Sequence, residues 1–352
     1  MHAQALYNLR FILASLVAFL HLTLWYSTAG IDINPVYQDF MSAFNIFFRT
    51  GGETSPAVLW FIVLSGYCIH RSFDGNLSHY IKHRAYRIIP LFVLGTVLGA
   101  LALIIFATPE IIAFLETELI TPLSLFYKLV GAQAFFPGLF EATYQGNAPL
   151  ETVAVEIWLY AFYPIGLVLL KRLGAARFLA VLVVMTLLGS LAVIYDPSLR
   201  PWWNNGSFLG FLTYWWIGMY FHNEKFCSKI KQLRYQLIIA YLFLTCFILV
   251  WPYNSLGIEL RKLALALIGG LVIVRLDFAS SYRRGLAELT QSSYSLYALH
   301  TPVIVACVYY NVKAELAFLL SILVAYLSYR FVERPLYYYA KRTSYSPQSS
   351  LG

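Results

Sequence analysis

Three ionisable side chains interrupt stretches of the sequence that are otherwise apolar. His21 lies in "LRFILASLVAFLHLTLWYS" (9–27), Glu156 in "ETVAVEIWLYAFYP" (151–164) and His300 in "SYSLYALHTP" (293–302). An ionisable group inside a membrane-spanning helix is costly and marks a functional site by default. A neutral imidazole is the usual base for removing a proton from a hydroxyl group. The three residues therefore predict proton-transfer chemistry in the membrane interior, with a purely structural hydrogen bond between helices as the alternative for each.

A pair of arginines predicts an anion site. Arg84 and Arg87 stand three residues apart in "YIKHRAYRIIP" (80–90), so they share one face of a helix, and Pro90 follows at the predicted membrane edge. Guanidinium groups match phosphate oxygens in a forked geometry. The alternative is ordinary positive charge beside a membrane. The functional interpretation is a clamp for a phosphate-bearing cytosolic substrate whose reactive end points towards His21.

A Ser-Gly pair lies inside another apolar run, "FIVLSGYCIHRSF" (61–73). Ser65 and Gly66 allow close approach of a neighbouring backbone. Taken alone, the pair favours a small-residue notch for helix packing over a functional site.

Composition defines the class of protein in which these residues must work. Of 352 residues, 60% are hydrophobic and 12% are charged, with a formal net charge of +8. A soluble domain carries about 25% charged residues, so the chain is predicted to be an integral membrane protein. The basic residues form short clusters between apolar runs, which indicates membrane topology and not a nucleic-acid groove. The four cysteines show no disulfide framework and no metal-binding spacing.

The apolar stretches predict an all-α fold, a polytopic bundle of transmembrane helices. A helix needs about 20 apolar residues to cross the hydrocarbon core. Ten stretches qualify as spans: 11–29, 55–70, 88–107, 149–169, 178–195, 206–221, 235–252, 262–276, 291–310 and 316–332. We expect one transmembrane domain over residues 1–342 and a short, polar, disordered tail at 343–352. The less apolar segment 119–140 is expected to be a lid or a re-entrant piece. A group of aromatic residues is interpreted as an interfacial belt: Trp202, Trp203, Tyr214, Trp215 and Trp216.

The distribution of charge predicts the orientation. With both termini in the cytoplasm, 19 of the 25 Lys and Arg residues fall on the cytoplasmic side, as the positive-inside rule requires. In this arrangement His21, Glu156 and His300 all lie towards the middle of the membrane, on separate helices. The three side chains are therefore expected to converge in one interior cavity.

These residues, taken in order, resemble the membrane-bound acyltransferase family three, whose bacterial members O-acylate cell-surface glycans. The resemblance runs from Arg10 to Pro335. In the first half, Arg10 and His21 match an arginine followed by ten residues and a histidine, Ser65, Gly66 and Ile69 match SGxxI, and Arg84 and Arg87 match RxxR. In the second half, Glu156 lies in a segment similar to Trp-Ser-Leu-x-x-Glu, "SYSLYALH" matches Ser-Tyr-x-x-Tyr-x-x-His, and "VERP" matches Glu-x-Pro. The chain departs from that pattern at Glu151 and Thr152, where the family has tryptophan and serine.

The resemblance implies a set of roles. His21 is the catalytic residue, either as the base that activates a hydroxyl or as a nucleophile that carries the acyl group. The donor is an acyl-CoA, most simply acetyl-CoA, with its phosphates on Arg84 and Arg87 and with Arg10 as a further contact. The Ser65–Gly66 notch is expected to admit the pantetheine arm or to supply a donor for the oxyanion. Glu156 is expected to orient His21 or to bind the acceptor.

Three further residues are expected in supporting roles: Tyr297 and His300 for substrate or structural support, and Glu333 as a structural tie to a neighbouring arginine. No metal is expected. The acceptor implied is a surface polysaccharide or lipid-linked glycan, and the location is the bacterial inner membrane. Two other classes stay open at this point, a transporter or flippase of a glycan or lipid precursor and a sensor or scaffold protein.

Overall fold

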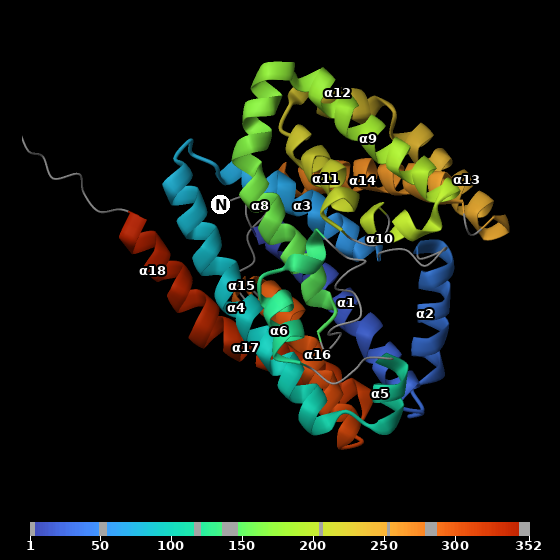
Figure 1. Ribbon diagram of the computed structural model, residues 1–352, viewed down its shortest axis with the longest axis vertical. Coiled ribbons are helices and arrows are strands. Elements are labelled where there is room, and N and C mark those ends of the chain that lie inside the picture. The colour runs from blue at the N-terminus through green and yellow to red at the C-terminus, as the bar shows by residue number, and fades with distance from the viewer. Residues whose placement is uncertain are drawn as a thin grey trace, which may run out of the picture.

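The computed structural model describes residues 4–48, 55–115, 121–135, 147–203, 207–251, 254–278 and 287–344, and within these ranges the chain is helical without strands (Figure 1). The helices of the first half are α1 (Gln4–Thr28), α2 (Pro35–Phe48), α3 (Pro56–Ser72), α4 (Leu77–Phe106), α5 (Pro109–Leu115), α6 (Pro122–Leu129), η1 (Ala132–Ala134) and α8 (Pro149–Leu173). Those of the second half are α9 (Ala175–Tyr195), η2 (Pro197–Leu199), α10 (Arg200–Trp203), α11 (Phe208–Tyr220), α12 (Glu224–Gln232), α13 (Arg234–Val250), α14 (Ser255–Phe278), α15 (Ala287–Gln291), α16 (Ser293–Tyr309), α17 (Ala314–Ser328), the π-helical turn η4 (Tyr329–Glu333) and α18 (Arg334–Ser344).

Five helical stretches in the described residues are long and apolar enough to cross a membrane. They are α1, α4, α8, α9 and the continuous stretch Ala314–Arg342. Counting α12 and α13, which meet at a bend of 62°, as one broken span raises the number to six. The prediction of an all-helical, multi-pass membrane protein is confirmed.

The predicted number of ten spans is not confirmed, and the remaining segments show why. The predicted spans 55–70, 206–221 and 291–310 form α3, α11 and α16, with 17, 13 and 17 residues. Most of their side chains are buried by neighbouring helices. The predicted span 262–276 belongs to α14, which begins seven residues earlier and includes charged side chains. Apolar stretches in this sequence therefore serve the interior of the bundle as well as its lipid-facing surface.

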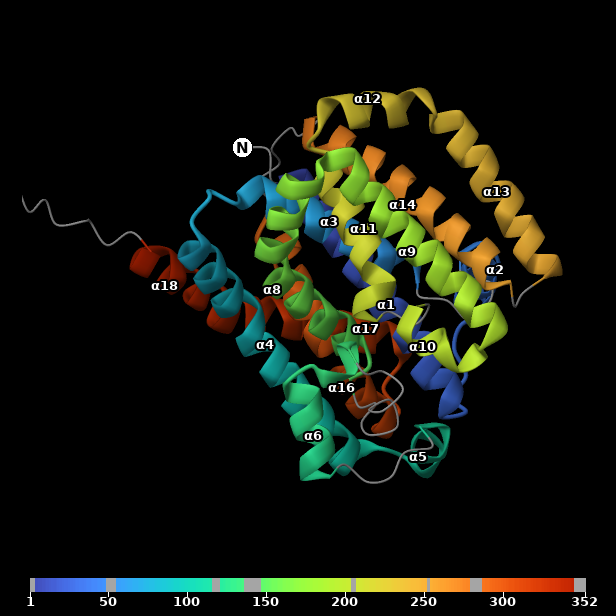
Figure 2. The same cartoon turned by 45° about the horizontal axis from the view of Figure 1, so that its top comes forward.

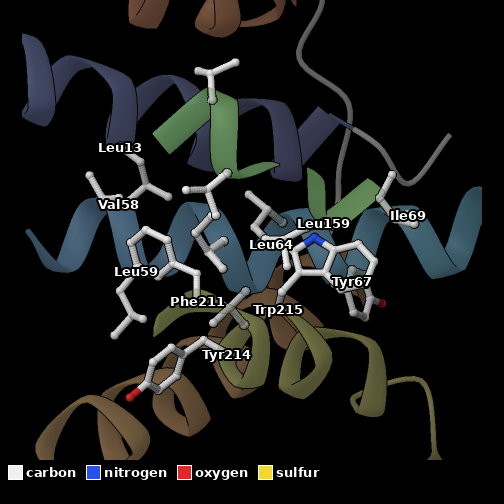
Figure 3. Close-up of a cluster of buried hydrophobic side chains, with 14 of the residues drawn as sticks. Leu13, Val58, Leu59, Leu64, Tyr67, Ile69, Leu159, Phe211, Tyr214 and Trp215 are labelled. Carbon is white, nitrogen blue, oxygen red and sulfur yellow. The ribbon is translucent and has the colours of Figure 1, made fainter. Parts of the chain in front are cut away.

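The centre of the bundle is α3, which begins at an N-cap where Ser55 accepts a hydrogen bond from the Ala57 amide, with Pro56 in the first turn. Side chains of α3 pack with those of α1, α8 and α11 (Figure 3). Gly66 faces α11 so closely that a Cβ atom there would lie 1.9 Å from the Trp215 carbonyl oxygen. A Cβ atom added at Gly218 of α11 would likewise lie 1.9 Å from the Val63 carbonyl oxygen of α3. Small residues on both helices thus allow backbone-to-backbone contact.

Prolines inside α8 and α16 shape the walls of the site described below. A proline has no amide hydrogen, so it leaves the carbonyl four residues earlier without its helical partner. Pro164 leaves the carbonyl of Tyr160, which accepts a hydrogen bond from the Tyr80 hydroxyl at 3.0 Å. Pro302 leaves the carbonyl of Ala298, which accepts from the Asn147 side-chain amide at 2.8 Å. Side chains from other elements therefore satisfy these backbone groups, as a lipid environment requires.

The predicted aromatic belt is partly wrong. Tyr214, Trp215 and Trp216 are fully buried in α11 and belong to the hydrophobic core. Tyr214 contacts two charged residues of α14: its hydroxyl donates to Glu259, and Lys262 lies over its ring at 5.5 Å. The Lys262 ammonium and the Glu259 carboxylate form a buried ion pair at 2.8 Å. The aromatic side chains thus serve helix packing and a buried polar contact.

Two peripheral predictions fall partly outside the described residues. The segment 119–140 contains α6 and η1 in its described part, and Trp158 of α8 donates a hydrogen bond to the Gly131 carbonyl at 3.2 Å. Residues 116–120 and 136–146 are not among those described, so the lid or re-entrant role stays a prediction. Of the predicted tail 343–352, the first two residues end α18 and the others lie outside the described residues.

Candidate active site

Two histidines from opposite ends of the chain meet inside the bundle. His21 of α1 and His300 of α16 are joined through His21 Nδ1 and His300 Nε2, which lie 2.9 Å apart. Their rings are stacked at 5.2 Å between centroids, with an angle of 19° between planes. His300 is fully buried and its Nδ1 lies 2.9 Å from the Leu296 carbonyl oxygen. The two helices pack side by side along this contact (Figures 1 and 2).

The hydrogen bonds determine where the protons sit when both rings are neutral, the form that a low-dielectric interior favours. A carbonyl oxygen only accepts, so His300 Nδ1 carries a proton and donates it to Leu296. His300 Nε2 is then unprotonated and accepts from His21 Nδ1–H. The proton of His21 is thereby held on Nδ1, and its Nε2 is the basic nitrogen. In many catalytic histidines a carboxylate accepts the Nδ1–H proton and fixes the tautomer. Here the His300 imidazole, itself bound to a carbonyl, has that role.

A wide cavity of about 570 Å³, with several charged side chains in its wall, opens near the start of α1 and α4 and beside α18. The arginines Arg10, Arg84 and Arg87 line it, together with Ser72 and Lys341. Figure 1 shows the N-terminus, the beginning of α4 and α18 on the same side of the molecule. Within the described residues, none of the three arginines forms an ion pair.

The geometry of Arg84 indicates an anion site. One of its terminal nitrogens donates to Ser72 at 2.5 Å, while its buried Nε has no hydrogen-bond partner among the described residues. Three guanidinium groups that form no ion pair among the described residues, with only scattered carboxylates nearby, produce a positive local potential. Such an arrangement suits a ligand with several negative charges, and phosphate oxygens match it best.

A narrow cavity of about 60 Å³ continues inward from the same three arginines. Five helices surround it: α1, α3, α4, α8 and α16. Its other lining residues include Phe61, Glu156, Tyr160, Tyr294 and Tyr297. At its inner end Tyr297 stands one helical turn before His300, and their ring centroids are 6.2 Å apart. The cavity therefore reaches from the arginines to Tyr297, whose ring neighbours that of His300, although neither histidine is among its lining residues.

Of the two roles predicted for Glu156, orienting His21 and binding the acceptor, its surroundings do not match the first. Its carboxylate accepts a hydrogen bond from the hydroxyl of Tyr160, one turn further along α8. Because His300 holds His21 Nδ1, Glu156 is not the group that orients His21. It lines the narrow cavity beside the arginines instead. The structure thus brings His21 and His300 together and places Glu156 in the neighbouring cavity.

Ser65 is bound into the same network. Its oxygen lies 2.8 Å from the Tyr160 hydroxyl and accepts from the Trp215 indole at 3.3 Å. Tyr160 gives its single proton to Glu156, so Ser65 must donate its own proton to Tyr160. Ser65 is therefore committed and is not placed to bind an oxyanion. Gly66 is occupied by the α11 backbone, so the predicted opening for a pantetheine arm is filled by helix packing.

Glu333 is buried in the π-helical turn and accepts from Ser295 at 2.8 Å. It also lines a cavity together with Arg87, so the predicted tie to a neighbouring arginine stays a prediction. Sequence reasoning missed Tyr160, which connects Glu156 with Ser65. The signal was present, because positions 156 and 160 are four apart and share a helix face. Among the described residues, no group of three or more His, Cys, Asp or Glu side chains is placed to hold a metal ion.

Comparison with known proteins gives the family directly. Searches of curated proteins and of solved structures found no match. The model of acyltransferase family 3, described as an acyltransferase domain, matches residues 4–330, nearly the whole chain. The match includes Arg10, His21, Arg84, Glu156 and His300. The chain therefore belongs to acyltransferase family 3.

Proposed function

We propose that this protein is an integral-membrane O-acetyltransferase that moves an acetyl group from acetyl-CoA to a hydroxyl of a surface polysaccharide or lipid-linked glycan. The observation that carries the proposal is the hydrogen-bonded chain from Leu296 through His300 to His21, which leaves His21 Nε2 as a base. A sugar hydroxyl becomes a useful nucleophile when such a base takes its proton in the transition state. Family membership supports acyl transfer as the reaction.

The donor is assigned by charge and by size. Coenzyme A carries several phosphate charges, which suit the cavity of about 570 Å³ lined by Arg10, Arg84 and Arg87. Its thin thioester end would enter the narrow cavity of about 60 Å³, which has room for a few water-sized groups. A small acyl group fits such a space best, and acetyl is the simplest.

Two routes of transfer use the same residues. In the first, the acceptor hydroxyl attacks the thioester carbonyl while its proton moves to His21 Nε2, and the departing thiolate of coenzyme A then takes that proton. In the second, His21 Nε2 attacks the thioester carbonyl and the C–S bond breaks, so that coenzyme A leaves as its thiolate. The acceptor hydroxyl then attacks the acetyl group on Nε2, the bond from Nε2 to the acetyl carbon breaks, and the thiolate takes the hydroxyl proton. In both routes His300 stabilises the charge that develops on the His21 ring through the 2.9 Å hydrogen bond.

The proposed topology places the wide cavity on the cytosolic side, where acyl-CoA is found. It retains the ten-span arrangement with both termini in the cytoplasm, supported by the clustering of basic residues around α4 and α18. The acceptor would approach from the opposite side of a bacterial inner membrane. In this arrangement the histidine pair lies between the two substrates.

Transfer of radiolabel tests this function. Membranes of a glycan-producing host that express the protein are given acetyl-labelled coenzyme A, and His21→Ala membranes at equal expression serve as control. The proposal expects ester-linked label on glycan with the wild type and none above background with the variant. Label that persists in the variant would move the chemistry away from His21. Absence of transferred label across hosts with different surface glycans would contradict the proposed reaction.

A further inference from the structure

The hydroxyl of Tyr297 is buried and forms no hydrogen bond of good geometry among the described residues, and the Thr152 side chain is its near neighbour in the cavity wall. Nearby tyrosines differ in this respect. Tyr294, one turn earlier on α16, donates to the Ile88 carbonyl at 2.9 Å, and Tyr163 lies 2.8 Å from a ring nitrogen of His70. A buried polar group without a partner lowers stability, so a protein keeps one for a reason outside its own fold.

Tyr297 is placed where the reacting end of a donor would arrive. It lines the narrow cavity that begins at the arginines, and its ring contacts Phe61 at 5.4 Å between centroids. On the same face of α16, its ring lies 6.2 Å from that of His300, the partner of His21. A thioester carbonyl in this part of the cavity would therefore lie beside the Tyr297 hydroxyl, one side chain away from the histidine pair.

Several polar groups of the cavity are committed to one another, and its three arginines are assigned to the phosphates of the donor. Ser65 donates to Tyr160 and accepts from Trp215, and Tyr160 donates to Glu156. Glu156 accepts the Tyr160 hydrogen bond and is not a donor in this network. Acyl transfer nevertheless needs a donor for the oxygen that becomes negative in the tetrahedral intermediate.

We propose that the hydroxyl of Tyr297 is this donor, a catalytic group for the acyl transfer on which the inference rests. When the nucleophile bonds to the carbonyl carbon, the electron pair of the C=O bond moves to its oxygen, and Tyr297 O–H donates a hydrogen bond to that oxygen. Collapse of the intermediate restores the C=O bond and breaks the C–S bond, and the thiolate takes the proton held by His21. Tyr297 keeps its own proton throughout.

The substitution Tyr297→Phe tests this role because it removes one hydroxyl and leaves the ring. We expect kcat to fall about a hundredfold, as for other single oxyanion donors. The KM for acetyl-CoA and the affinity for desulfo-coenzyme A, which has no thioester, should not change. Thermal stability should be equal or higher, because the hydroxyl makes no hydrogen bond of good geometry in the resting protein.

The matched control is Tyr220→Phe in α11. The Tyr220 hydroxyl donates to the Ala175 carbonyl at 2.5 Å, far from the cavity, so this variant should lose stability and keep kcat. An unchanged kcat in Tyr297→Phe would overturn the inference alone. A loss of kcat that accompanies an equal loss of stability would also overturn it, since the hydroxyl would then be structural. An inactive wild-type protein would overturn the proposed acyl transfer and this inference with it.

Discussion

Replacing His300 tests how the histidine pair works. In His300→Leu, His21 Nδ1–H loses its acceptor at 2.9 Å, whereas in His300→Gln a side-chain oxygen can take the place of Nε2. The neutral hydrogen bond that selects the tautomer contributes about 1 kcal/mol, and the charge-assisted bond formed in the transition state contributes about 1.5–3 kcal/mol. Their sum of about 2.5–4 kcal/mol corresponds to a fall in kcat of roughly seventyfold to a thousandfold.

The assay is the rate of coenzyme A release by purified wild-type and variant proteins in detergent or nanodiscs, with saturating acceptor glycan. His300→Leu should lose activity to the stated extent. His300→Gln should be at least about tenfold faster than His300→Leu, since one restored hydrogen bond is equivalent to about 1.4 kcal/mol. Melting temperatures of both variants control for damage to the fold. Equal rates for the two variants would refute the reasoning, because they differ in their ability to hold the His21 proton.

Three other substitutions test the donor cavity and the fold. Arg84→Ala should raise the KM for acetyl-CoA about tenfold or more with a smaller change in kcat, because one charge-assisted contact is lost; an unchanged KM would remove Arg84 from the donor site. Gly66→Ala should abolish or strongly reduce folded protein in detergent-solubility assays, because its Cβ would lie 1.9 Å from the Trp215 carbonyl oxygen; normal yield and melting would show that α3 and α11 pack less closely. Lys262→Met should destabilise the protein by about 3–5 kcal/mol by leaving Glu259 buried without its 2.8 Å partner, and the double variant with Glu259→Gln should recover stability in thermal melts; an additive loss would contradict this pairing.

Much of the candidate site could be anticipated from residue types. An ionisable side chain in an apolar stretch is visible in any sequence, and this rule selected His21, Glu156 and His300. The spacing of Arg84 and Arg87 on one helix face was equally readable. These residues do lie around one connected region, in which Arg10, Arg84, Arg87 and Glu156 line the cavities and the two histidines pair beyond Tyr297.

The partners within the site could not be read from the sequence. His21 and His300 are 279 residues apart, and no local pattern distinguishes His300 from Glu156 as the neighbour of His21. The roles of Ser65 and Gly66 depend on how closely α11 approaches, which the sequence of α3 does not contain. Helix packing decides both, so the sequence identified functional residue types and left their pairing open.

The predicted number of membrane spans is not confirmed, for a related physical reason. Hydropathy measures how well a segment tolerates an apolar environment, and the interior of a helix bundle is such an environment as well as lipid. The short helices α3, α11 and α16 are apolar because other helices bury them. In α14, Glu259 and Lys262 form an ion pair inside the protein. The helix therefore includes residues 255–261, which lie outside the predicted span 262–276.

The most direct test of the account is a structure of the protein with a stable thioether analogue of acetyl-CoA bound. The account predicts phosphates on Arg84 and Arg87, and the reacting end at the inner end of the narrow cavity, within reach of His21 Nε2 and the Tyr297 hydroxyl. A donor whose phosphates lie away from these arginines, or whose acyl end is separated from His21 by a helix, would contradict the central claim that His21 performs the transfer.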